Sequence, residues 1–597
     1  MTPAGWITIA IIAVAALLLV TERLRPDLVA LLVLLALGLS GVVTPEEAVS
    51  GFSRSAVITI LALFILTHGL EKTGVTRWIS FRLLSLAGPS PARLTAILML
   101  TAAALSVFMN TIAAAAVLLP ITMSIARHSG HPPSRLLMPL AFGVLLGGTA
   151  TLLTTANIIV STTLAQHAIR PFGLLDFAPV GLPLTILGAL LVVVLSPRLL
   201  PTRDVAGEVA RMSRLRKELS QVYHLHEGTS EVVIEPGSSM AGQTLHEGGW
   251  GHTLGLTVLA ISHHGRLRLA PDRDAQIQEG DVILLEGAPT PEQMEAYGLR
   301  FTSAPGLEDA LVSYSVPIAE VTLAPRSALE GRTLRDIRFR ERYGLQVLAI
   351  WRQGLVIQHE LADIPLRFGD AMLVQGPRDR LDLLRYAVDF LLLEEAGNGR
   401  PGRKGALATG ILIACLGLAA SGAIPIAVAT LGGAALMVVT GCLTMDDAYH
   451  AVDWRTVFLV AGMLPLSIAL DRTGTSALLG RALVDASGGF GALATAAILL
   501  LITVALSVLL GGQTVAVILA PVAIAAASAI GADPRAMAMA VALGCSLGFL
   551  SPLTHPASML VMGPGGYTTR DYFRLGAPLT AVSILVTLAG LHWIWGL

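Results

Sequence analysis

The sequence predicts an α-helical polytopic membrane protein with an inserted soluble α+β domain, and three observations support this fold class. Hydrophobic residues make up 54% of the 597 residues and charged residues only 14%, whereas a soluble domain carries about 25% charged residues. Apolar runs of membrane-spanning length fill residues 1–200 and 405–597. Residues 204–398 hold most of the charge. We therefore expect two membrane blocks, 1–203 and 399–597, on either side of a soluble insert.

Charge balance and cysteine content exclude several function classes. The 40 Lys and Arg against 41 Asp and Glu give a net charge of -1, so no overall charge would attract nucleic acid. The three cysteines lie in or beside apolar runs, too few and too scattered for a disulfide framework or a thiolate metal site. The polar membrane segments offer no Ser/His/Asp arrangement and no paired carboxylates, so we expect no enzyme activity.

The first membrane block contains six apolar runs, and its charged loops set their orientation. The runs cover about residues 5–20, 27–43, 56–70, 94–126, 136–165 and 173–197. Basic residues follow the first, third and fourth runs, whereas the loop between the second and third carries Glu46, Glu47 and a single Arg54. Because basic loops stay in the cytoplasm, we expect a multi-pass protein of the inner (plasma) membrane with a cytoplasmic insert.

The run 94–126 is predicted to be a re-entrant hairpin. Basic residues flank both of its ends, so the chain enters and leaves on the same face. Asn110 and Thr111 lie in its middle, with about 16 residues on either side, fewer than the roughly 20 that a span needs. Polar backbone at that depth lines a cavity or is buried in protein.

The second membrane block repeats the first. Residues 43–48, Val-Thr-Pro-Glu-Glu-Ala, match 443–448, Leu-Thr-Met-Asp-Asp-Ala, and Glu71-Lys-Thr-Gly matches Asp471-Arg-Thr-Gly at the same offset. With the hairpin counted as no crossing, an odd number of spans separates the two copies. The sequence thus predicts an inverted-topology repeat, which is typical of secondary transporters. If the hairpin were a true span, the repeat would be parallel.

Each block also contains an apolar run interrupted by small and polar residues. Gly147-Gly148 and a cluster of Thr interrupt the first, and Pro552 and Pro556 interrupt the second, beyond a hairpin tip at 511–514. Such breaks predict discontinuous helices whose ends bind ions at mid-membrane. No charged side chain occurs in these segments, so we expect a neutral site that binds an anion through helix N-termini and hydrogen bonds.

Packing is the alternative role for these residues. Small and hydroxyl residues are common where membrane helices pack, and for any single Thr this role is favoured. Asn110, Gln513 and His555 are costlier to bury at membrane depth, which favours function. We expect replacement of His555 by Ala to change affinity or pH dependence.

The insert carries its own duplication. Pro236-Gly-Ser-x-x-x-Gly-x-Thr-Leu aligns with Pro325-Arg-Ser-x-x-x-Gly-x-Thr-Leu, and Gly280-Asp281 aligns with Gly369-Asp370 at the same spacing. Alternating apolar runs predict strands, so we expect two small α+β modules, 204–300 and 301–398. They resemble the TrkA C-terminal (RCK-C) domain, which implies a regulatory role with an unknown ligand. A scaffolding role is an equal alternative.

Two motifs resemble those of the divalent anion/sodium symporters. The stretch from Ser551 to Tyr567, which begins Ser-Pro-Leu-Thr-His-Pro, is similar to a family signature, and Asn110-Thr111 followed by Leu118-Leu-Pro120 is similar to the family's hairpin tip. The similarity spans both membrane blocks. It implies a secondary active transporter of a small divalent anion, with sodium (Na+) as the coupling ion and a homodimeric assembly.

The resemblance also implies site residues. Those implied for the substrate are Asn110, Thr111, Thr155, Gln513, Thr514, Ser551, Pro552 and His555. Those implied for two sodium sites are Ser106, Asn110, Gly148, Asn157, Ser507, Gln513 and Ser558. The chain departs from the family pattern at three positions: Met109 stands in place of Ser, and Gln513 and Ser558 stand in place of Asn.

Three functions are compatible with these patterns. Sulfate is the favoured substrate, because family members with the same inserted modules include sulfate transporters and because no Arg is placed to clamp a carboxylate. A C4-dicarboxylate is the second candidate. A membrane sensor that binds the anion without transporting it is the third, and the altered tip residues favour it.

Overall fold

The computed structural model shows the chain as two compact units, 1–205 with 318–597, and 206–317, each of which is described by itself. Residues 204 and 398, where we expect the insert to begin and end, lie outside the described residues. The structure describes residues 2–597 apart from 22, 85, 87–89, 130, 204–228, 246, 251–255, 264–265, 270, 272–274, 287–289, 303–317, 325–326, 353–354, 358–360, 377–379, 382–383, 385–388, 394–401 and 403.

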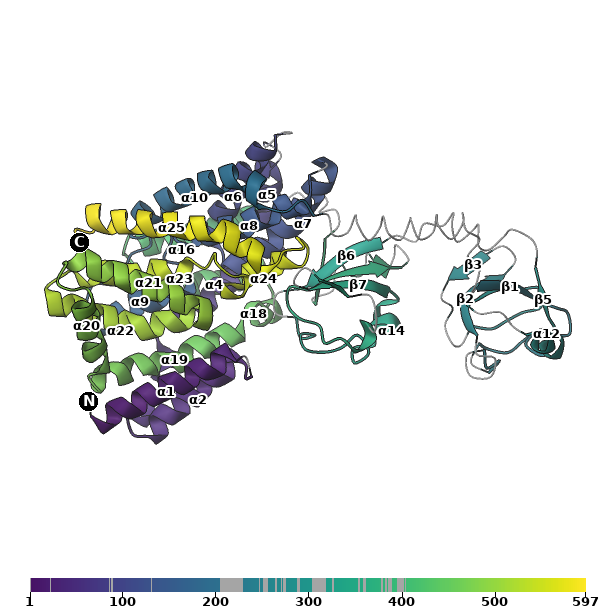
Figure 1. Cartoon of the computed structure of the whole chain (residues 1–597), viewed down its shortest axis with the longest axis horizontal. Coiled ribbons are helices and arrows are strands. Elements are labelled where there is room, and N and C mark those ends of the chain that lie inside the picture. Colours follow the sequence, from purple (N-terminus) through teal and green to yellow (C-terminus); the bar gives the residue numbers. More distant parts are fainter. Residues whose placement is uncertain are drawn as a thin grey trace. The chain divides into compact units, whose positions relative to one another are not determined.

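Helices of the first block and of the second follow the same order (Figure 1). The first block contains α1 (Pro3–Val20), α2 (Pro26–Leu39), α3 (Pro45–Val49), α4 (Ser55–Lys72), α5 (Val75–Leu84), α6 (Pro91–Phe108), α7 (Thr111–Ser129), α8 (Leu137–Gly148), α9 (Thr155–Gln166) and α10 (Ala178–Leu199). The second contains α16 (Gly405–Ala420), α17 (Ile426–Val439), α18 (Met445–Ala451), α19 (Trp454–Arg472), α20 (Thr475–Ala486), α21 (Ala492–Leu510), α22 (Gly512–Ile530), α23 (Pro534–Ser546), α24 (Pro556–Met562) and α25 (Thr569–Trp593).

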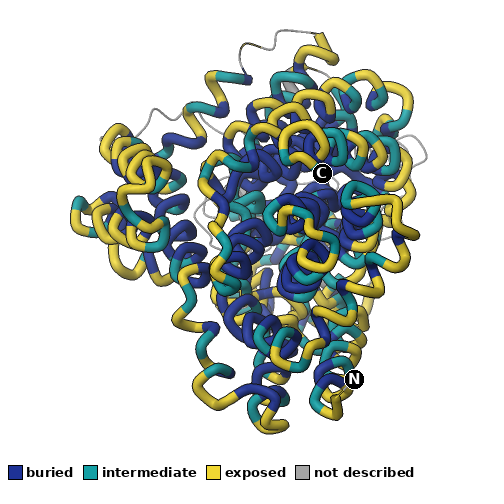
Figure 2. Tube along the Cα trace, turned by 90° about the vertical axis from the view of Figure 1, so that its left-hand side faces the viewer, coloured by how far each residue is buried: buried dark blue, intermediate teal, exposed yellow. Residues whose placement is uncertain are grey.

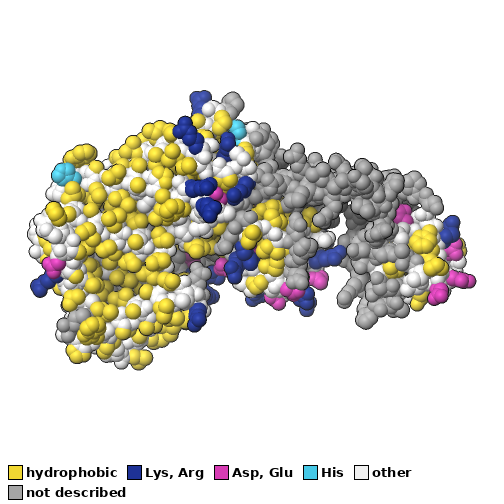
Figure 3. All heavy atoms as spheres, viewed as in Figure 1, with side chains coloured by type: hydrophobic (Ala, Val, Ile, Leu, Met, Phe, Trp, Pro, Cys, Tyr) yellow, Lys and Arg dark blue, Asp and Glu magenta, His cyan; other side chains and the backbone are white. Residues whose placement is uncertain are grey.

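The helical part has the surface of a membrane protein, which confirms the predicted fold class. Among the described residues, eight helices are long and apolar enough to span a bilayer. Large apolar side chains on their outer faces are exposed, as in Leu17 at 63%, Ile186 at 60% and Leu585 at 67%, which water would not tolerate over so wide a patch. Buried helices lie at the centre with exposed ones around them (Figure 2). Hydrophobic side chains cover most of the visible helical face, and Lys and Arg gather at one end of it (Figure 3).

Two reciprocal ion pairs join the blocks. Lys72, at the end of α4, pairs with Asp447 in the first turn of α18. Arg472, at the end of α19, donates to both carboxylate oxygens of Glu47 in α3 at 2.7 and 2.8 Å. The ammonium of Lys72, with the hydroxyl and N–H of Thr444, holds the pKa of the Asp447 carboxyl well below its usual range. Glu47 and Asp447 each complete a capping box with a Thr three residues earlier, so both short helices begin in the same way.

Both predicted hairpins have a break at the tip. Helix α6 ends at Phe108 and α7 begins at Thr111 after the extended Met109, whereas α21 and α22 are separated by Gly511 alone. Gly511 has φ +79°, which suits only a glycine. The structure adds helices that the apolar runs do not predict. Among them are α5 and α20, which are short and whose apolar patterns are interrupted by charged residues.

The soluble part contains two sheets with the same strand arrangement. The first holds β1 (Thr229–Ile234), β2 (Thr257–His263), β3 (Arg266–Leu269), β4 (Val282–Glu286) and β5 (Leu299–Phe301), with α12 (Pro291–Tyr297) before the last strand. The second holds β6 (Ile318–Leu323), β7 (Gln346–Arg352), β8 (Leu355–Ile357), β9 (Ala371–Gln375) and β10 (Phe390–Leu392), with α14 (Phe339–Tyr343) before β7.

The two sheets share details beyond their strand count. Their orders, β3-β2-β4-β1-β5 and β8-β7-β9-β6-β10, are equivalent and fully antiparallel. Each has a bulge at the matching place, between Val258 and Ala260 and between Val347 and Ala349. The two sheets are consistent with the expected duplication of the insert. The resemblance to RCK-C domains and the module boundaries 204–300 and 301–398 stay predictions.

The ion pair of His167 gives the helical part a predicted dependence on pH. His167 Nε2 lies 3.0 Å from Asp471 Oδ2, and Nδ1 lies 2.9 Å from the carbonyl of Thr163. The hydrogen bond to Asp471 raises the pKa of His167 above its ordinary value of 6.5, against the effect of burial. A raised pKa means that the stabilisation is complete below pH 6.5 and is lost as pH rises through the folded-state pKa.

We expect the melting temperature of the purified protein to fall between pH 6 and pH 9 by more in the wild type than in His167→Gln. Asp471→Asn should flatten the profile in the same way, and His131→Gln serves as the control that should keep the wild-type slope. An unchanged slope in both His167→Gln and Asp471→Asn would contradict the assignment.

Candidate functional site

The breaks of the two blocks meet in a crossed arrangement. Arm α7 of the first hairpin packs on α24 of the second block, and arm α22 of the second hairpin packs on α9 of the first. Within each block, a glycine brings the hairpin close to the helix before the break: a Cβ added at Gly147 would lie 2.3 Å from the carbonyl oxygen of Ala103, and one at Gly512 would lie 2.5 Å from that of Cys545. Helices α7, α9, α22 and α24 all begin in this region, which places four partly positive helix N-termini beside the breaks.

Thr111 and His555 are brought together although 444 residues separate them in sequence. The Thr111 hydroxyl lies 3.2 Å from His555 Nε2, and the N–H of Ala557 donates to His555 Nδ1 at 3.1 Å. Because Nδ1 accepts a hydrogen bond, the ring proton of the neutral imidazole sits on Nε2 and donates to the Thr111 oxygen. The Thr111 hydroxyl hydrogen is then left to donate to an anion.

Substitutions of His555 should separate its two roles. Asn at this position keeps an oxygen for the N–H of Ala557 but is too short to reach Thr111. We therefore expect His555→Asn to retain wild-type thermal stability and to raise the substrate KM. His555→Ala loses both contacts, so it should also lower stability by about 1 kcal/mol. Uptake kinetics and thermal melting measure the two effects. A wild-type KM in both variants would remove His555 from the site.

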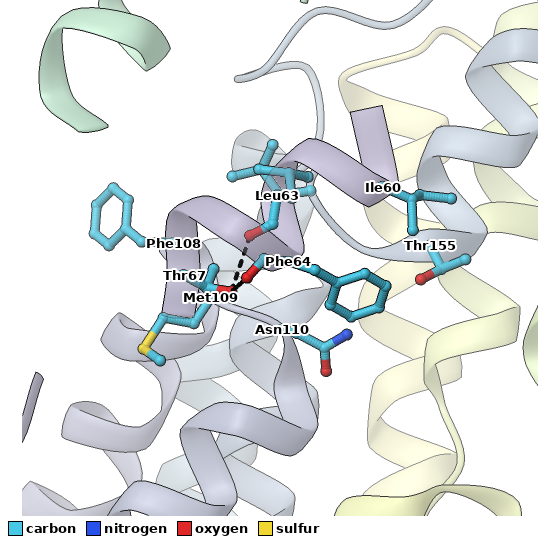
Figure 4. A pocket seen from close by; sticks show the side chains of 9 residues that line it. Ile60, Leu63, Phe64, Thr67, Phe108, Met109, Asn110 and Thr155 are labelled. Carbon is cyan, nitrogen blue, oxygen red and sulfur yellow. Dashed lines mark hydrogen bonds between the residues drawn. The ribbon is translucent and has the colours of Figure 1, made fainter. Parts of the chain in front are cut away.

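Asn110 and Thr155 line one small cavity (Figure 4). Its volume is about 20 Å³, room for about one or two water molecules, and α4 closes it with Ile60, Leu63, Phe64 and Thr67. The carbonyl oxygen of the Asn110 side chain accepts from the N–H of Ile112 at 2.9 Å. This bond caps α7 and leaves the amide nitrogen of Asn110 as a donor toward the cavity.

Buried oxygen atoms without hydrogen-bond partners surround the breaks. Near the breaks they include those of Ser106, Thr154 and Asn157 in the first block and of Ser507, Thr554 and Ser558 in the second. Other such oxygens in the described part of the chain belong to Thr76, Thr122, Ser467, Thr580, Ser583 and Thr587. Ser507 has only the weak thiol of Cys545 near it. Such orphaned atoms are rare in folded proteins and call for a bound ion or water. Their chemistry, hydroxyl and amide oxygens beside broken helix ends, fits sodium.

Gly148 lies within the first group of oxygens. A Cβ added there would lie 3.0 Å from the Thr154 methyl, 3.4 Å from that of Thr111 and 3.8 Å from Ser106 Oγ. In the second block a Cβ at Gly548 would lie 2.5 Å from the Thr554 methyl. Sequence reasoning missed Thr154 and Thr554, although their spacing of 400 residues is that of the repeated motifs and could have revealed them.

The remaining residues predicted for the substrate site, Ser551, Pro552, Gln513 and Thr514, lie near the breaks of the second block. Ser551 Oγ accepts from the N–H of Leu553 at 3.3 Å, and Pro552 is buried beside it. Gln513 and Thr514 lie in the first turn of α22. Pro120 and Pro521 each follow their helix start by nine residues, so Thr111 corresponds to Gly512 rather than to Thr514. Within the described residues, no side-chain hydrogen bond joins Gln513 or Thr514 to the first tip.

Several ionisable groups of the helical part form ion pairs with one another. Examples are Arg535 with Asp176 at 2.5 Å and Arg203 with Asp571 at 3.0 Å. Within the described residues, no group of three or more His, Cys, Asp or Glu could hold a metal ion. The candidate site therefore offers helix N-termini, hydroxyls, amides and one imidazole as binding groups.

Comparison with known proteins decides the family. The family model described as "Citrate transporter" matches residues 16–594. The chain belongs to the citrate transporter family. It is accordingly a multi-pass membrane transporter and not an enzyme, and the resemblance of its membrane blocks to anion symporters is confirmed.

Relatives of this transporter cover its whole length. It is 32% identical to the uncharacterized transporter YfbS of Escherichia coli, over 97% of both chains. It is 33% identical to the uncharacterized transporter sll0640 of Synechocystis, over 99% of this chain and 97% of the other. Sodium/sulfate cotransporter 2 of Chlamydomonas reinhardtii is 22% identical over 99% of this chain and 91% of its own. A solved YdaH transporter from Alcanivorax borkumensis is 14% identical, with a TM-score of 0.41 over 94% and 88% of the chains.

Proposed function

We propose that this chain is a sodium-coupled transporter that moves a divalent oxyanion, sulfate, across the inner (plasma) membrane. The observation that carries the proposal is the crossed pair of broken helices and hairpin tips, which gathers helix N-termini, hydroxyls and orphaned oxygens without any charged side chain. Partly positive N-termini and O–H groups suit an anion, and orphaned oxygens suit a small hard cation. Both ions would thus bind at the same breaks, where each can favour the binding of the other.

The reciprocal ion pairs support an inverted repeat. Helix α4 begins at Ser55, one short turn beyond the helix α3 that contains Glu47, and about 27 Å further along its axis it ends at Lys72, which pairs with Asp447. Residues 47 and 447 therefore lie at opposite ends of a helix long enough to span the bilayer. Since they are equivalent positions of the two copies, the copies have opposite orientations. The C-terminal end of α10 and the start of α16 lead to the insert. In this arrangement both lie on the same side of the membrane as Lys72, which is the cytoplasmic side.

Sulfate is preferred to a C4-dicarboxylate for two reasons. The cavity at Asn110 and Thr155, about 20 Å³, would have to widen for either anion, and by less for a compact sulfate than for a four-carbon chain. Similar full-length proteins from Chlamydomonas are named sodium/sulfate cotransporters. Asn110, Thr111, Thr155 and His555 would donate to the sulfate oxygens, with Gln513, Thr514 and Ser551 on the other side. Ser106, Gly148 and Asn157 would hold one sodium, and Ser507 and Ser558 the other.

A sensor that binds sulfate without moving it is the second candidate function. A relative from Chlamydomonas, 27% identical over 92% of this chain and 95% of its own, carries the name of a sulfur deprivation response regulator. The two sheets of the insert would then be the signalling part, whereas in a transporter they would regulate flux. In both cases the protein would work as a homodimer.

Proteoliposomes test the proposal. We expect radiolabelled sulfate to accumulate only when a sodium gradient is directed inward, with radiolabelled succinate as the competing substrate. Accumulation of succinate and not of sulfate would show that the substrate is a C4-dicarboxylate. Sulfate binding with no uptake in either gradient direction would support the sensor and overturn transport.

A further inference from the structure

The second sheet of the insert docks on the end of the helical part where the site would open. The loop of Gly369 meets α24 so closely that a Cβ added at Gly563 would lie 2.2 Å from the carbonyl oxygen of Gly369 and 2.8 Å from the nitrogen of Ala371. In the other direction, a Cβ at Gly369 would lie 2.7 Å from the carbonyl oxygen of Met559. Two backbones are in direct contact here, and neither position leaves room for a side chain.

Further contacts hold this sheet in place. Leu393, just beyond β10, is fully buried in the same hydrophobic cluster as α6, α7 and α8, with Phe368 and Leu391 packed against that cluster. Glu330 pairs with Arg455 at the start of α19 at 3.0 Å. The first sheet differs at the matching loop, because a Cβ at Gly280 would meet nothing within 4 Å among the described residues.

A cavity of about 190 Å³ lies beneath the docked sheet. Its helical walls are Ile112 and Pro556, the immediate neighbours of Thr111 and His555, and Asp453 and Arg455 at the start of α19. The sheet supplies the rest of the wall: Leu323, Ala324, Ser327, Glu330 and Phe368. The cavity thus runs from beside the candidate anion site to the start of α19, and the second sheet covers it. Figure 1 shows β6 and β7 beside α18 and α24.

We propose that the second sheet of the insert is a lid on the cytoplasmic vestibule of the anion site. The second sheet contacts two groups of helices. It contacts α24, which packs with the hairpin arm α7 at the breaks, and α19, which packs with α2. A body that contacts both groups opposes movement between them and blocks the exit beneath it. Release of the lid opens the path. The inference rests on the proposed anion site, and the test below does not require transport.

The test measures the accessibility of a cysteine placed in the vestibule. Ile112→Cys is introduced into the full chain, and its reaction with a membrane-impermeant maleimide is followed in inside-out vesicles. The native cysteines 415, 442 and 545 are buried, and the chain without Ile112→Cys gives the background. Gly563 has φ -63° and ψ -59°, which alanine adopts without backbone strain. The methyl group of Gly563→Ala would instead clash with the backbone of Gly369 and push the second sheet away.

We expect Gly563→Ala to raise the labelling rate about fivefold or more, and Glu330→Arg to raise it about two- to fivefold. The double variant Glu330→Arg with Arg455→Glu should return the rate toward the wild type. Gly410→Ala, at a helical glycine with nothing within 4 Å, and Asp363→Arg, which breaks only the Arg335 pair within the sheet, are the matched controls and should change nothing. Wild-type labelling in both Gly563→Ala and Glu330→Arg, or equal increases in the controls, would overturn the lid.

Sulfate uptake by the same variants separates the lid from the proposed function. Faster sulfate uptake in Glu330→Arg than in the wild type supports both the lid and sulfate transport. If no variant takes up sulfate or succinate while labelling rises as expected, transport fails and the lid stands. If uptake proceeds and labelling does not respond, the lid is wrong and transport stands.

Discussion

Thr111→Val should raise the KM for sulfate about 10- to 100-fold with the protein still folded. The Thr111 oxygen accepts from His555, so its own hydrogen is left for the substrate. A hydrogen bond to a charged group is worth about 1.5–3 kcal/mol, and Val keeps the shape of the side chain while removing that bond. Initial rates of radiolabelled sulfate uptake into proteoliposomes measure the effect.

Thr111→Ser and Thr95→Val are the controls. Serine retains the hydroxyl, so Thr111→Ser should stay within a few-fold of the wild type. Thr95 lies in the other arm of the hairpin and donates its hydroxyl to the carbonyl of Pro91 at 3.0 Å, away from the tip. Equal losses in Thr111→Val and Thr95→Val would show that the loss comes from a disturbed hairpin and not from a missing contact to the anion.

Ser106→Ala and Ser507→Ala should each weaken sodium binding about tenfold or more, the equivalent of one lost charge-assisted contact of ~1.5 kcal/mol. Neither hydroxyl has a hydrogen-bond partner in the described structure apart from the thiol beside Ser507. Without sodium, removal of an unsatisfied buried hydroxyl costs nothing and can stabilise the fold. The two variants should therefore melt at or above the wild-type temperature in sodium-free buffer.

Addition of sodium should reverse that order. Ligand binding stabilises the native state according to ligand concentration over Kd, so weaker sites gain less. We expect the wild type to gain more thermal stability from sodium than either variant, with choline chloride as the ionic-strength control. Ser80→Ala, at a buried serine that donates to the carbonyl of Thr76, should keep the full sodium response. A full response in Ser106→Ala and Ser507→Ala would mean that these oxygens do not hold sodium.

The features that the sequence predicts well are those with a local cause. Asn110 in the middle of an apolar run and Pro552 and Pro556 in another disfavour continuous helices, and the structure breaks at those places. The second tip is harder to place, because Gln513 attracts attention by its polarity. The turn itself is made by Gly511, whose positive φ lets α22 begin at Gly512 and puts Gln513 inside the helix.

Other features depend on contacts between distant segments and carry no local signal. The short helices α5 and α20 have Arg residues that interrupt their apolar patterns. The bond between Thr111 and His555 depends on the packing of α7 against α24 across the two blocks. The docking of the second sheet depends on two glycines, Gly369 and Gly563, whose sequence surroundings give no indication that their backbones touch.

Accessibility labelling at positions 50 and 450 tests the central claim most directly. Ser50 follows α3 and His450 lies in α18, the equivalent short helices of the two blocks. In Ser50→Cys and His450→Cys, an impermeant maleimide should label residue 50 only from outside intact cells and residue 450 only in inside-out vesicles. Labelling of both cysteines from the same side would contradict the inverted repeat, and with it the shared mid-membrane site for the anion and sodium.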